Sequence, residues 1–246
     1  MRVGDFVITK REVLVSVSII AILLMIGVWI SGGITEARLD ADEMYNKAVK
    51  IDTADLFEYG MRTNIGNAFV YGDLKAVDTV TFPEIGGEYM YVRKITERYT
   101  RHTRTVTKTR TVNGKTQTYT TTEVYWSWDE IDRESHTCDE VTFLGVVFDS
   151  EKFDIPSENY IGRIKESSRI RYEYYGTGTE HVGTIFTDLR DDTITDGTNF
   201  YEDMTIDETV EWLKAIDWTV GFWIIWIIVI GGCVYGFFYI DNRWLE

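Results

Sequence analysis

Histidine, cysteine and proline are scarce in this chain of 246 residues, which has three His, two Cys and two Pro. So few imidazoles and thiols leave little material for a metal centre or for a nucleophile assisted by histidine. Of the two cysteines, Cys138 lies between two long apolar blocks and Cys233 lies inside the second block. The region between the blocks therefore cannot form an internal disulfide. Because this region also lacks an N-x-S/T sequon, we expect a bacterial or phage-derived surface protein rather than an animal secretory one.

Basic residues are fewer than acidic ones, 25 against 40, which gives a formal net charge of -15. Proteins that bind nucleic acid are usually basic, so we expect no nucleic-acid partner. The chain also has no G-x-S-x-G, Walker loop, H-E-x-x-H or paired Cys-x-x-Cys. We therefore assign no catalytic residue, cofactor or metal ligand, and we expect a protein that is not an enzyme. An enzyme of the cell envelope stays an alternative, although no residue indicates its reaction.

Two short patterns match metal sites only in part. His136 and Cys138 are soft ligands two residues apart, but zinc needs two more, and neither His102 nor His181 has a supporting spacing. Positions one, five, six and twelve of a calcium-loop template are matched by Asp192, Asp196, Gly197 and Asp203. Position three is Ile194, however, and position twelve is not glutamate. We expect surface residues in the first case and an Asp-Gly hairpin turn in the second.

Two long apolar blocks, residues 13–31 and 218–240, contain no charged residue. Both exceed the roughly 18 apolar residues that are enough to cross a bilayer, so we expect two transmembrane helices and exclude a soluble single-domain protein. A cleaved signal peptide is the alternative for the first block. That alternative is weakened because the 19 residues exceed the usual h-region and no A-x-A site follows.

The charges beside the first block predict the orientation of the chain. Arg2, Lys10 and Arg11 precede the block, and mainly acidic residues follow it. Because basic flanks stay in the cytoplasm, we expect cytoplasmic tails at residues 1–12 and 241–246 and an outer domain at residues 32–217. The plasma membrane of a bacterium is the expected location. Within the second block, Gly232 and Gly236 form a G-x-x-x-G spacing that predicts a helix-packing seam.

The outer domain is expected to be mainly β with minor α, because runs of β-branched and aromatic residues recur along it. The predicted strands are residues 67–82, 89–112, 115–128, 141–148, 169–175 and 181–187, with a possible turn or bulge at Gly72-Asp73. A polar helix at residues 35–50 is expected to continue the first block. The spacing of Thr205 and Glu208 is typical of a capping box and predicts a short amphipathic helix from about Ile206.

Residues 98–129 are expected to form a long projecting β-hairpin arm. Asn113-Gly114 is a strong signal for a two-residue turn, and a register fixed on it pairs threonine with threonine on one face in four successive rows. Those rows are Thr111 with Thr116, Thr109 with Thr118, Thr107 with Thr120 and Thr105 with Thr122. A slip of one residue would scatter the threonines over both faces. At the base, Tyr99, Trp126 and Trp128 fall on the threonine side, where we expect them to join the arm to the domain.

Residues 93–115 contain eight basic residues and one acidic residue, a local charge of +7 inside a domain whose remainder is -22. Three interpretations are open. The arm is a solvated ribbon without a ligand, or it docks on the acidic surface of a neighbouring copy, or it touches an external polyanion of the cell envelope. The expected contact face consists of Arg104, Lys108, Arg110, Lys115 and Tyr119.

Four segments, FVYGDLKAVD, EYMYVRKITERYTRHTRTV, TTEVYWSWDEI and VTFLGVVFD, occur in this order between residues 67 and 150. In aromatic and turn placement this stretch resembles the LUMA-type and beside-a-membrane families and two-span proteins of Gram-positive bacteria and their phages. The resemblance implies a β-rich domain between two spans. It does not imply ubiquitin-ligase activity, because the ligase members carry a zinc-binding RING after the second span and here six residues follow it.

The expected function is that of a non-enzymatic, membrane-anchored surface protein that acts through contacts of its β domain and hairpin. The alternative is a two-span sensor or accessory subunit that relays an outside contact to another membrane protein. Its expected partners are therefore the lipid bilayer, a second copy or another membrane protein, and an envelope polyanion.

Overall fold

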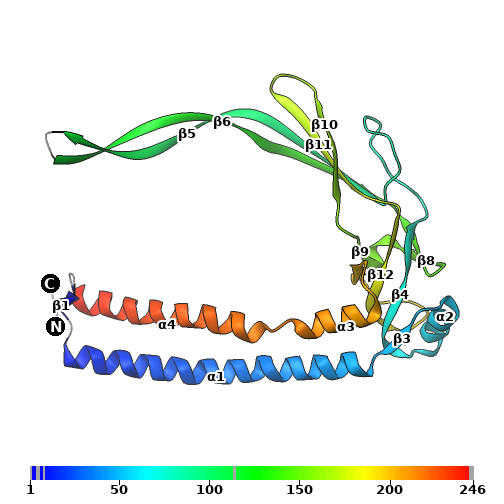
Figure 1. Ribbon diagram of the computed structural model, residues 1–246, viewed down its shortest axis with the longest axis horizontal. Helices are drawn as coiled ribbons and strands as arrows, with labels where there is room; N and C mark the ends of the chain where they lie inside the picture. The colour runs from blue at the N-terminus through cyan, green and yellow to red at the C-terminus, as the bar shows by residue number, and fades with distance from the viewer. Residues whose placement is uncertain (1, 4–5, 8, 113–114, 244–246) are drawn as a thin grey trace. The chain divides into compact units, whose positions relative to one another are not determined.

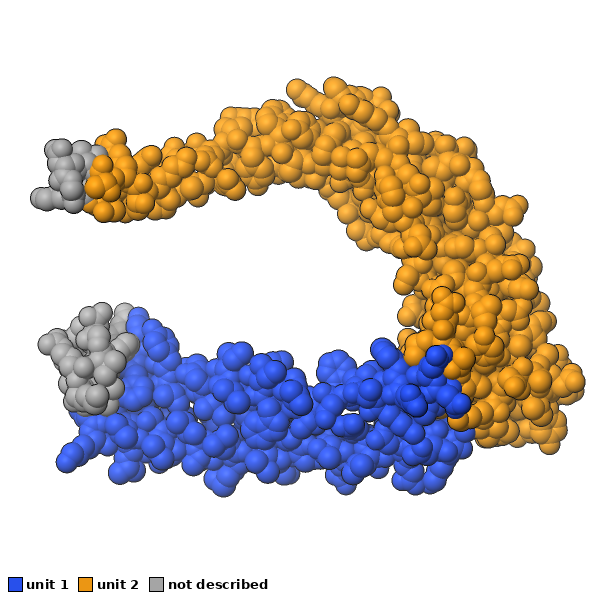
Figure 2. All heavy atoms as spheres, viewed as in Figure 1, with its two compact units in different colours: residues 1–48, 207–246 blue, residues 49–206 orange. Residues whose placement is uncertain are grey.

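The computed structural model describes residues 2–3, 6–7, 9–112 and 115–243 and divides into two compact units (Figures 1 and 2). Unit 1 comprises residues 1–48 and 207–246, and unit 2 comprises residues 49–206. Two long apolar helices belong to unit 1, and the chain between them forms a mostly β unit. This much of the expected fold class is confirmed.

Unit 1 is built from α1 (Lys10–Lys47), α3 (Ile206–Ala215) and α4 (Trp218–Arg243), with the short strands β1 (Arg2–Val3) and β2 (Phe6–Val7) beside them. Thr9 caps α1, because its hydroxyl accepts from the backbone N–H of Glu12 and that carboxylate accepts from the N–H of Thr9. The predicted polar helix is the continuation of α1 to Lys47. Both α1 and the segment from Ile206 to Asp241 are long and apolar enough to cross a membrane, and most side chains of their apolar stretches are exposed.

The contact between α1 and α4 is made at Gly27. The indole N–H of Trp226 donates to the carbonyl of Leu23 at 3.0 Å, and the indole N–H of Trp223 donates to the Ser31 hydroxyl at 3.2 Å. A Cβ added to Gly27 would lie 2.4 Å from Nε1 of Trp226, so only glycine permits this approach.

The glycines that predicted a packing seam are not part of this contact. No described atom lies within 4 Å of a Cβ built at Gly232 or Gly236. The seam within unit 1 therefore uses a small residue of the first helix with two tryptophans of the second. A contact of Gly232 and Gly236 with another chain stays a prediction.

Unit 2 contains a seven-stranded sheet whose central strands are β4 (Gly66–Ala76) and β12 (Glu180–Leu189), paired antiparallel along ten residues. The strand order is β8-β7-β4-β12-β13-β9, and β3 pairs parallel with β4. The other strands are β3 (Val49–Ile51), β7 (Glu140–Phe143), β8 (Val146–Asp149), β9 (Phe153–Asp154) and β13 (Thr198–Glu202), with a 3-10 turn at Ser150–Lys152. Helix α2 (Ala54–Thr63) buries Phe57, Gly60 and Met61 on one face, and Phe57 and Met61 join the main core with residues such as Leu74 and Phe143.

Several sequence-based boundaries are wrong within this sheet. Gly72-Asp73 is neither a turn nor a bulge, since β4 runs through both residues. Glycine is needed there because a Cβ on Gly72 would lie 2.5 Å from Cγ of Leu144. The single strand expected at residues 141–148 is a hairpin, in which Leu144 and Gly145 turn the chain with φ of 50° and 82°. Helix α2 and strands β3, β9 and β13 were not expected.

The second sheet has four strands in the order β10-β11-β5-β6. They are β10 (Asn159–Lys165), which was not expected, β11 (Ile170–Thr177), β5 (Tyr91–Val112) and β6 (Lys115–Thr137). A small core under this sheet contains Phe82, Val92 and Tyr174. Strand β11 pairs with β5 only from Tyr91 to Arg98, so β5 and β6 continue beyond it as a two-stranded ribbon (Figure 1).

Candidate functional site

The two-stranded ribbon confirms the predicted arm, residues 98–129. Every cross-strand pair of the predicted register is present, from Arg104 opposite Glu123 to Val112 opposite Lys115. Asn113 and Gly114, the predicted turn, lie outside the described residues. At about 3.3 Å per residue, the part of β5 beyond Arg98 is about 45 Å long. Strand β6 is longer than expected, because beyond a bulge at Thr96/Glu97 it stays paired with the base of β5 as far as Thr137.

One face of the arm is an uncharged surface of threonines. Thr105, Thr107, Thr109 and Thr111 lie opposite Thr122, Thr120, Thr118 and Thr116, and all eight are exposed. Val124 and Thr103 add a fifth uncharged row nearer the base. Neither hydrophobic core of unit 2 includes any of these residues. The arm therefore projects from the domain, as the sequence predicted.

The opposite face carries the basic residues, and two of them are already paired. Arg104 and Lys108 both bind the carboxylate of Glu123, at 3.1 and 2.6 Å. The Lys108 and Arg104 contacts lower the pKa of Glu123, and the Glu123 contact raises the pKa of Lys108. These three residues together have a net charge of +1, so they attract a polyanion less than the sequence count suggests.

The remaining members of the expected contact face lie nearer the tip. The guanidinium carbon of Arg110 is 5.9 Å from the centroid of the Tyr119 ring. The backbone of Lys115 begins β6, while its side chain lies outside the described side chains. The structure thus places all five predicted residues on one face of the arm by register, but it assigns Arg104 and Lys108 to an ion pair within the arm.

Nearer the base, the same face holds a polar group around Asp129. The Asp129 carboxylate accepts from the Ser127 hydroxyl at 2.8 Å and contacts Nε2 of His102 at 2.5 Å. The Ser127 bond, followed by that of His102, keeps the pKa of Asp129 below its usual range. The His102 ring stacks on Tyr125 with centroids 5.2 Å apart. This histidine is therefore engaged within the arm and does not meet His136 or His181.

The base of the threonine face is an aromatic and arginine stack. Tyr99 lies between Trp126 and Trp128, with ring centroids 5.3 and 5.2 Å apart. Arg171 covers Trp128 at 4.3 Å, and Arg169 lies 6.0 Å from the Trp126 centroid. These rings contact the domain, as expected, but through cation–π contacts with Arg171 and Arg169 and not through either hydrophobic core.

Exposed apolar surface on the arm is confined to one strand. Tyr119, Val124, Tyr125 and Trp126 are 46, 49, 44 and 44 % exposed, and all four belong to β6. Among the described side chains of β5 in the arm, no large apolar residue is exposed to this degree. The alternation of side chains along the sequence distinguishes the two faces of the ribbon but not its two edges, so it could not predict this asymmetry.

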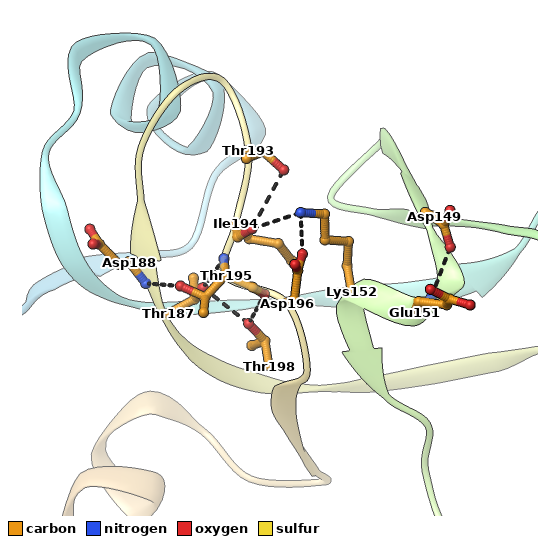
Figure 3. Close-up of polar contacts among 10 residues, drawn as sticks. All are labelled: Asp149, Glu151, Lys152, Thr187, Asp188, Thr193, Ile194, Thr195, Asp196 and Thr198. Atoms are coloured by element: carbon orange, nitrogen blue, oxygen red, sulfur yellow. Dashed lines mark hydrogen bonds and ion pairs between the residues drawn. The ribbon is translucent and has the colours of Figure 1, made fainter.

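The metal-like patterns are satisfied by other contacts. Cys138 is buried, and burial raises the pKa of its thiol to about 11. Asp196 is bound by the ammonium group of Lys152, which also donates to the Ile194 carbonyl at 3.3 Å (Figure 3). The connection between β12 and β13 spans residues 190–197, so the two-residue Asp-Gly hairpin expected there is wrong, although Gly197 does adopt a φ of 65°. Within the described residues no group of three potential metal ligands occurs.

No protein-family model matches the chain, and no curated protein or solved structure matches it. The resemblance to domains that lie between two spans beside a membrane therefore stays a prediction. The case for a function rests on the geometry of the arm.

Proposed function

We propose that this chain is a non-enzymatic membrane protein that acts through contacts of unit 2, and chiefly through the arm. The observation that supports this proposal is the exposure of Tyr119, Val124, Tyr125 and Trp126 on one strand of a projecting ribbon. Val124 and Trp126 lie on the threonine face and Tyr119 and Tyr125 on the opposite face, so the four side chains share one edge of the ribbon and not one face. Exposed apolar groups that gather along one edge are typical of interaction sites. The arm also has a fixed base, because the sheet and the arginine stack hold it, and a fixed base lets a long ribbon present these residues in one orientation.

The membrane part of the proposal assigns α1 and α4 to the bilayer, with both termini in the cytoplasm and unit 2 outside. Length, apolar character and exposure of the helices support insertion. The basic residues before the first helix support the orientation, and a bacterial plasma membrane is the proposed location.

Single cysteines test this topology. We would place one at Lys10 and one at Thr109, both exposed, in a background without Cys138 and Cys233. An impermeant thiol reagent applied to intact cells should label Thr109→Cys and leave Lys10→Cys unlabelled until the membrane is opened. Equal labelling of the two positions in intact cells would exclude the proposed topology.

The contact function is tested with a photo-crosslinking residue in place of Tyr125 in cells that express the full chain. The matched control is Tyr160 on β10, which is 54 % exposed but lies outside the arm. We expect covalent adducts with a protein or an envelope polymer from Tyr125 and not from Tyr160. Adducts at both positions, or at neither, would contradict a contact function of the arm.

A variant with a shortened hairpin provides a second test of the contact function. Replacing residues 99–128 with Asn-Gly makes Arg98 and Asp129 the pair that flanks the turn, in the same alternation as Val112 and Lys115. The four-stranded sheet should keep its thermal stability, while the protein or envelope polymer that is captured through Tyr125 of the full chain should no longer co-purify with the shortened chain.

A second candidate function, a sensor or accessory subunit, is supported by the open glycines of α4. Because α1 packs at Gly27, and no other described residue comes within 4 Å of a Cβ built at Gly232 or Gly236, this side of α4 can take another transmembrane helix. Changing both glycines to leucine should remove a co-purifying membrane protein in mild detergent without changing the α1–α4 contact. Unchanged co-purification would leave the arm as the contact site.

A further inference from the structure

We infer that the free edge of β6 pairs antiparallel with the same edge of a second copy of this chain, centred on Thr122. This inference rests on the proposed contact function of the arm and names its partner. Strand β6 ends the order β10-β11-β5-β6, so among the described residues nothing pairs with its outer side from Lys115 to Thr137. A strand edge of this length presents unpaired N–H and C=O groups and is a ready template for another strand.

The two edges of the arm differ in their protection against such pairing. Within the arm, β5 carries Arg101, Arg104, Lys108 and Arg110, and charged residues of this kind are what proteins use to keep an edge single. In β6, residues 116–128 contain one charged residue, Glu123, and no proline or glycine. Glu123 is moreover paired with Arg104 and Lys108 of the same arm. Strand β6 therefore lacks the charged residues that prevent edge-to-edge pairing, and it is also the strand whose aromatic side chains are exposed.

The backbone pattern decides which residues of β6 can pair outward. In a two-residue hairpin Val112 and Lys115 exchange hydrogen bonds, and such pairs alternate along the ribbon. The N–H groups of the odd-numbered β6 residues then point to β5, and those of the even-numbered residues, Thr122 among them, point to the free edge. A second copy must accordingly pair even residues with even residues, which also continues the threonine face across both copies.

A register centred on Thr122 fits the side chains. It sets Tyr119 opposite Tyr125 and Thr122 opposite itself, while Val124 and Trp126 face Thr120 and Thr118 of the other copy. Aromatic pairs and threonine pairs are favourable across antiparallel strands. Glu123 lies opposite Thr121, so no like charges meet. By contrast, centring the pairing on Glu123 would set two carboxylates against each other.

The expected partner of the β6 edge is a second copy of this chain, because the edge is complementary to itself under a two-fold rotation. Two-fold rotation is the usual symmetry of a homodimer. The excess of basic residues on β5 does not oppose this arrangement, since β5 lies on the far side of β6 in both copies. An extended segment of another protein would need to supply the same uncharged, aromatic pattern, and it is an outcome of the test.

A pair of lysine substitutions tests the inference in the full chain, purified in mild detergent. Thr122→Lys puts two ammonium groups against each other at the two-fold axis, while Thr105→Lys, the matched control, adds the same charge to the same row and face on β5. We expect a dimer by light scattering for the wild type and for Thr105→Lys, and at least a tenfold weaker dimer for Thr122→Lys. A monomeric wild type overturns the inference, and so does equal weakening by both variants, which would indicate a contact through the face.

Cysteine crosslinking in membranes tests the register in a background without Cys138 and Cys233. A paired Thr122→Cys would place its Cα atoms about 5.5 Å apart, within disulfide range, whereas Thr118→Cys would lie about 27 Å from its copy at about 3.3 Å per residue. Mild oxidation should crosslink Thr122→Cys alone. Crosslinking of both or of neither overturns this pairing.

These experiments distinguish a failure of the self-pairing inference from a failure of the proposed contact function. If the adducts at Tyr125 are with another protein and Thr122→Lys removes them while the wild type is monomeric, the contact function stands and the self-pairing inference is wrong. If the Tyr125 crosslinker gives no adduct at all and the wild type is monomeric, both fail.

Discussion

Arg171 lies over the ring of Trp128, with its guanidinium carbon 4.3 Å from the ring centroid. Arg171 belongs to β11 and Trp128 to β6, so this contact crosses β5, and the same guanidinium binds Glu97 of β5 at 2.5 Å. One side chain thus holds three neighbouring strands at the point where the sheet narrows to the arm. We conclude that the orientation of the arm is fixed by polar and cation–π contacts and not by either apolar core.

The first prediction concerns this base. Arg171→Ala leaves Glu97 largely shielded without its partner and uncovers Trp128, so it should lower the free energy of unfolding by about 1–3 kcal/mol. Arg169→Ala is the control, because Arg169 lies 6.0 Å from the Trp126 centroid and has no ion pair with a described residue. The control should cost less than about 1 kcal/mol. Denaturant unfolding of the full chain in detergent measures both losses, and equal losses would show that Arg171 contributes no more to the base of the arm than Arg169.

A second prediction concerns the close approach of Gly72 and Leu144. A methyl group on Gly72 would lie 2.5 Å from Cγ of Leu144, so Gly72→Ala should destabilise unit 2 by about 1–3 kcal/mol. Leu144→Ala removes the clash, and the double variant should be more stable than the sum of the two single effects predicts, by about 1 kcal/mol. Thermal unfolding of the four proteins gives this coupling. Additive effects would contradict the tight contact.

The parts of the fold that the sequence predicted are those set by local patterns. The arm register followed from Asn113-Gly114 and the alternation of threonines, because a side-chain period of two allows only one register to collect them on one face. The last nine residues of β6 were missed, since an acidic stretch such as residues 129–134 has no strand pattern of its own. It becomes a strand because β5 supplies partners such as Lys94 opposite Glu134.

The candidate site was predicted less well, because its contacts depend on residues distant in sequence. Register alone paired Arg104 with Glu123, but Lys108, which lies opposite Tyr119, reaches the same carboxylate through the direction of its long side chain. Arg171 reaches Trp128 through β11, which lies about forty residues further along the chain, and no local pattern indicates this. The free edge of β6 likewise follows from the strand order of the whole sheet.

A third prediction separates the glycines of the two apolar helices. Gly27→Leu should disrupt the α1–α4 contact, because the added side chain would occupy the position of the Trp226 indole. We expect a loss of about 1–3 kcal/mol in resistance to SDS unfolding, followed by near-ultraviolet circular dichroism. Gly232→Leu, where no described atom is within 4 Å, should change this resistance by no more than about 0.5 kcal/mol. A larger loss of resistance from Gly232→Leu would mean that α4 contacts α1 through the side that carries Gly232 and not through Trp223 and Trp226.

The last prediction uses the pH dependence of Asp78. Its carboxylate accepts the backbone N–H groups of Asp139 and Glu140 at 2.9 and 2.8 Å, and these bonds keep the pKa of Asp78 below its usual range. A carboxyl whose pKa is lowered by folding stabilises the protein fully above its unfolded value of about 3.9, and the contribution is lost as the pH falls through the folded value.

Asp78→Asn keeps one acceptor oxygen but sets an amide N–H₂ against the second backbone donor. The substitution should therefore lower the free energy of unfolding by about 1 kcal/mol at neutral pH, a value discounted for the exposure of Asp78. The difference in urea midpoint between wild type and variant should be constant from about pH 7 to about pH 4 and should narrow at lower pH, as wild-type Asp78 becomes protonated. A difference that persists unchanged at about pH 2.5 would mean that the two backbone bonds do not depend on the charge of Asp78.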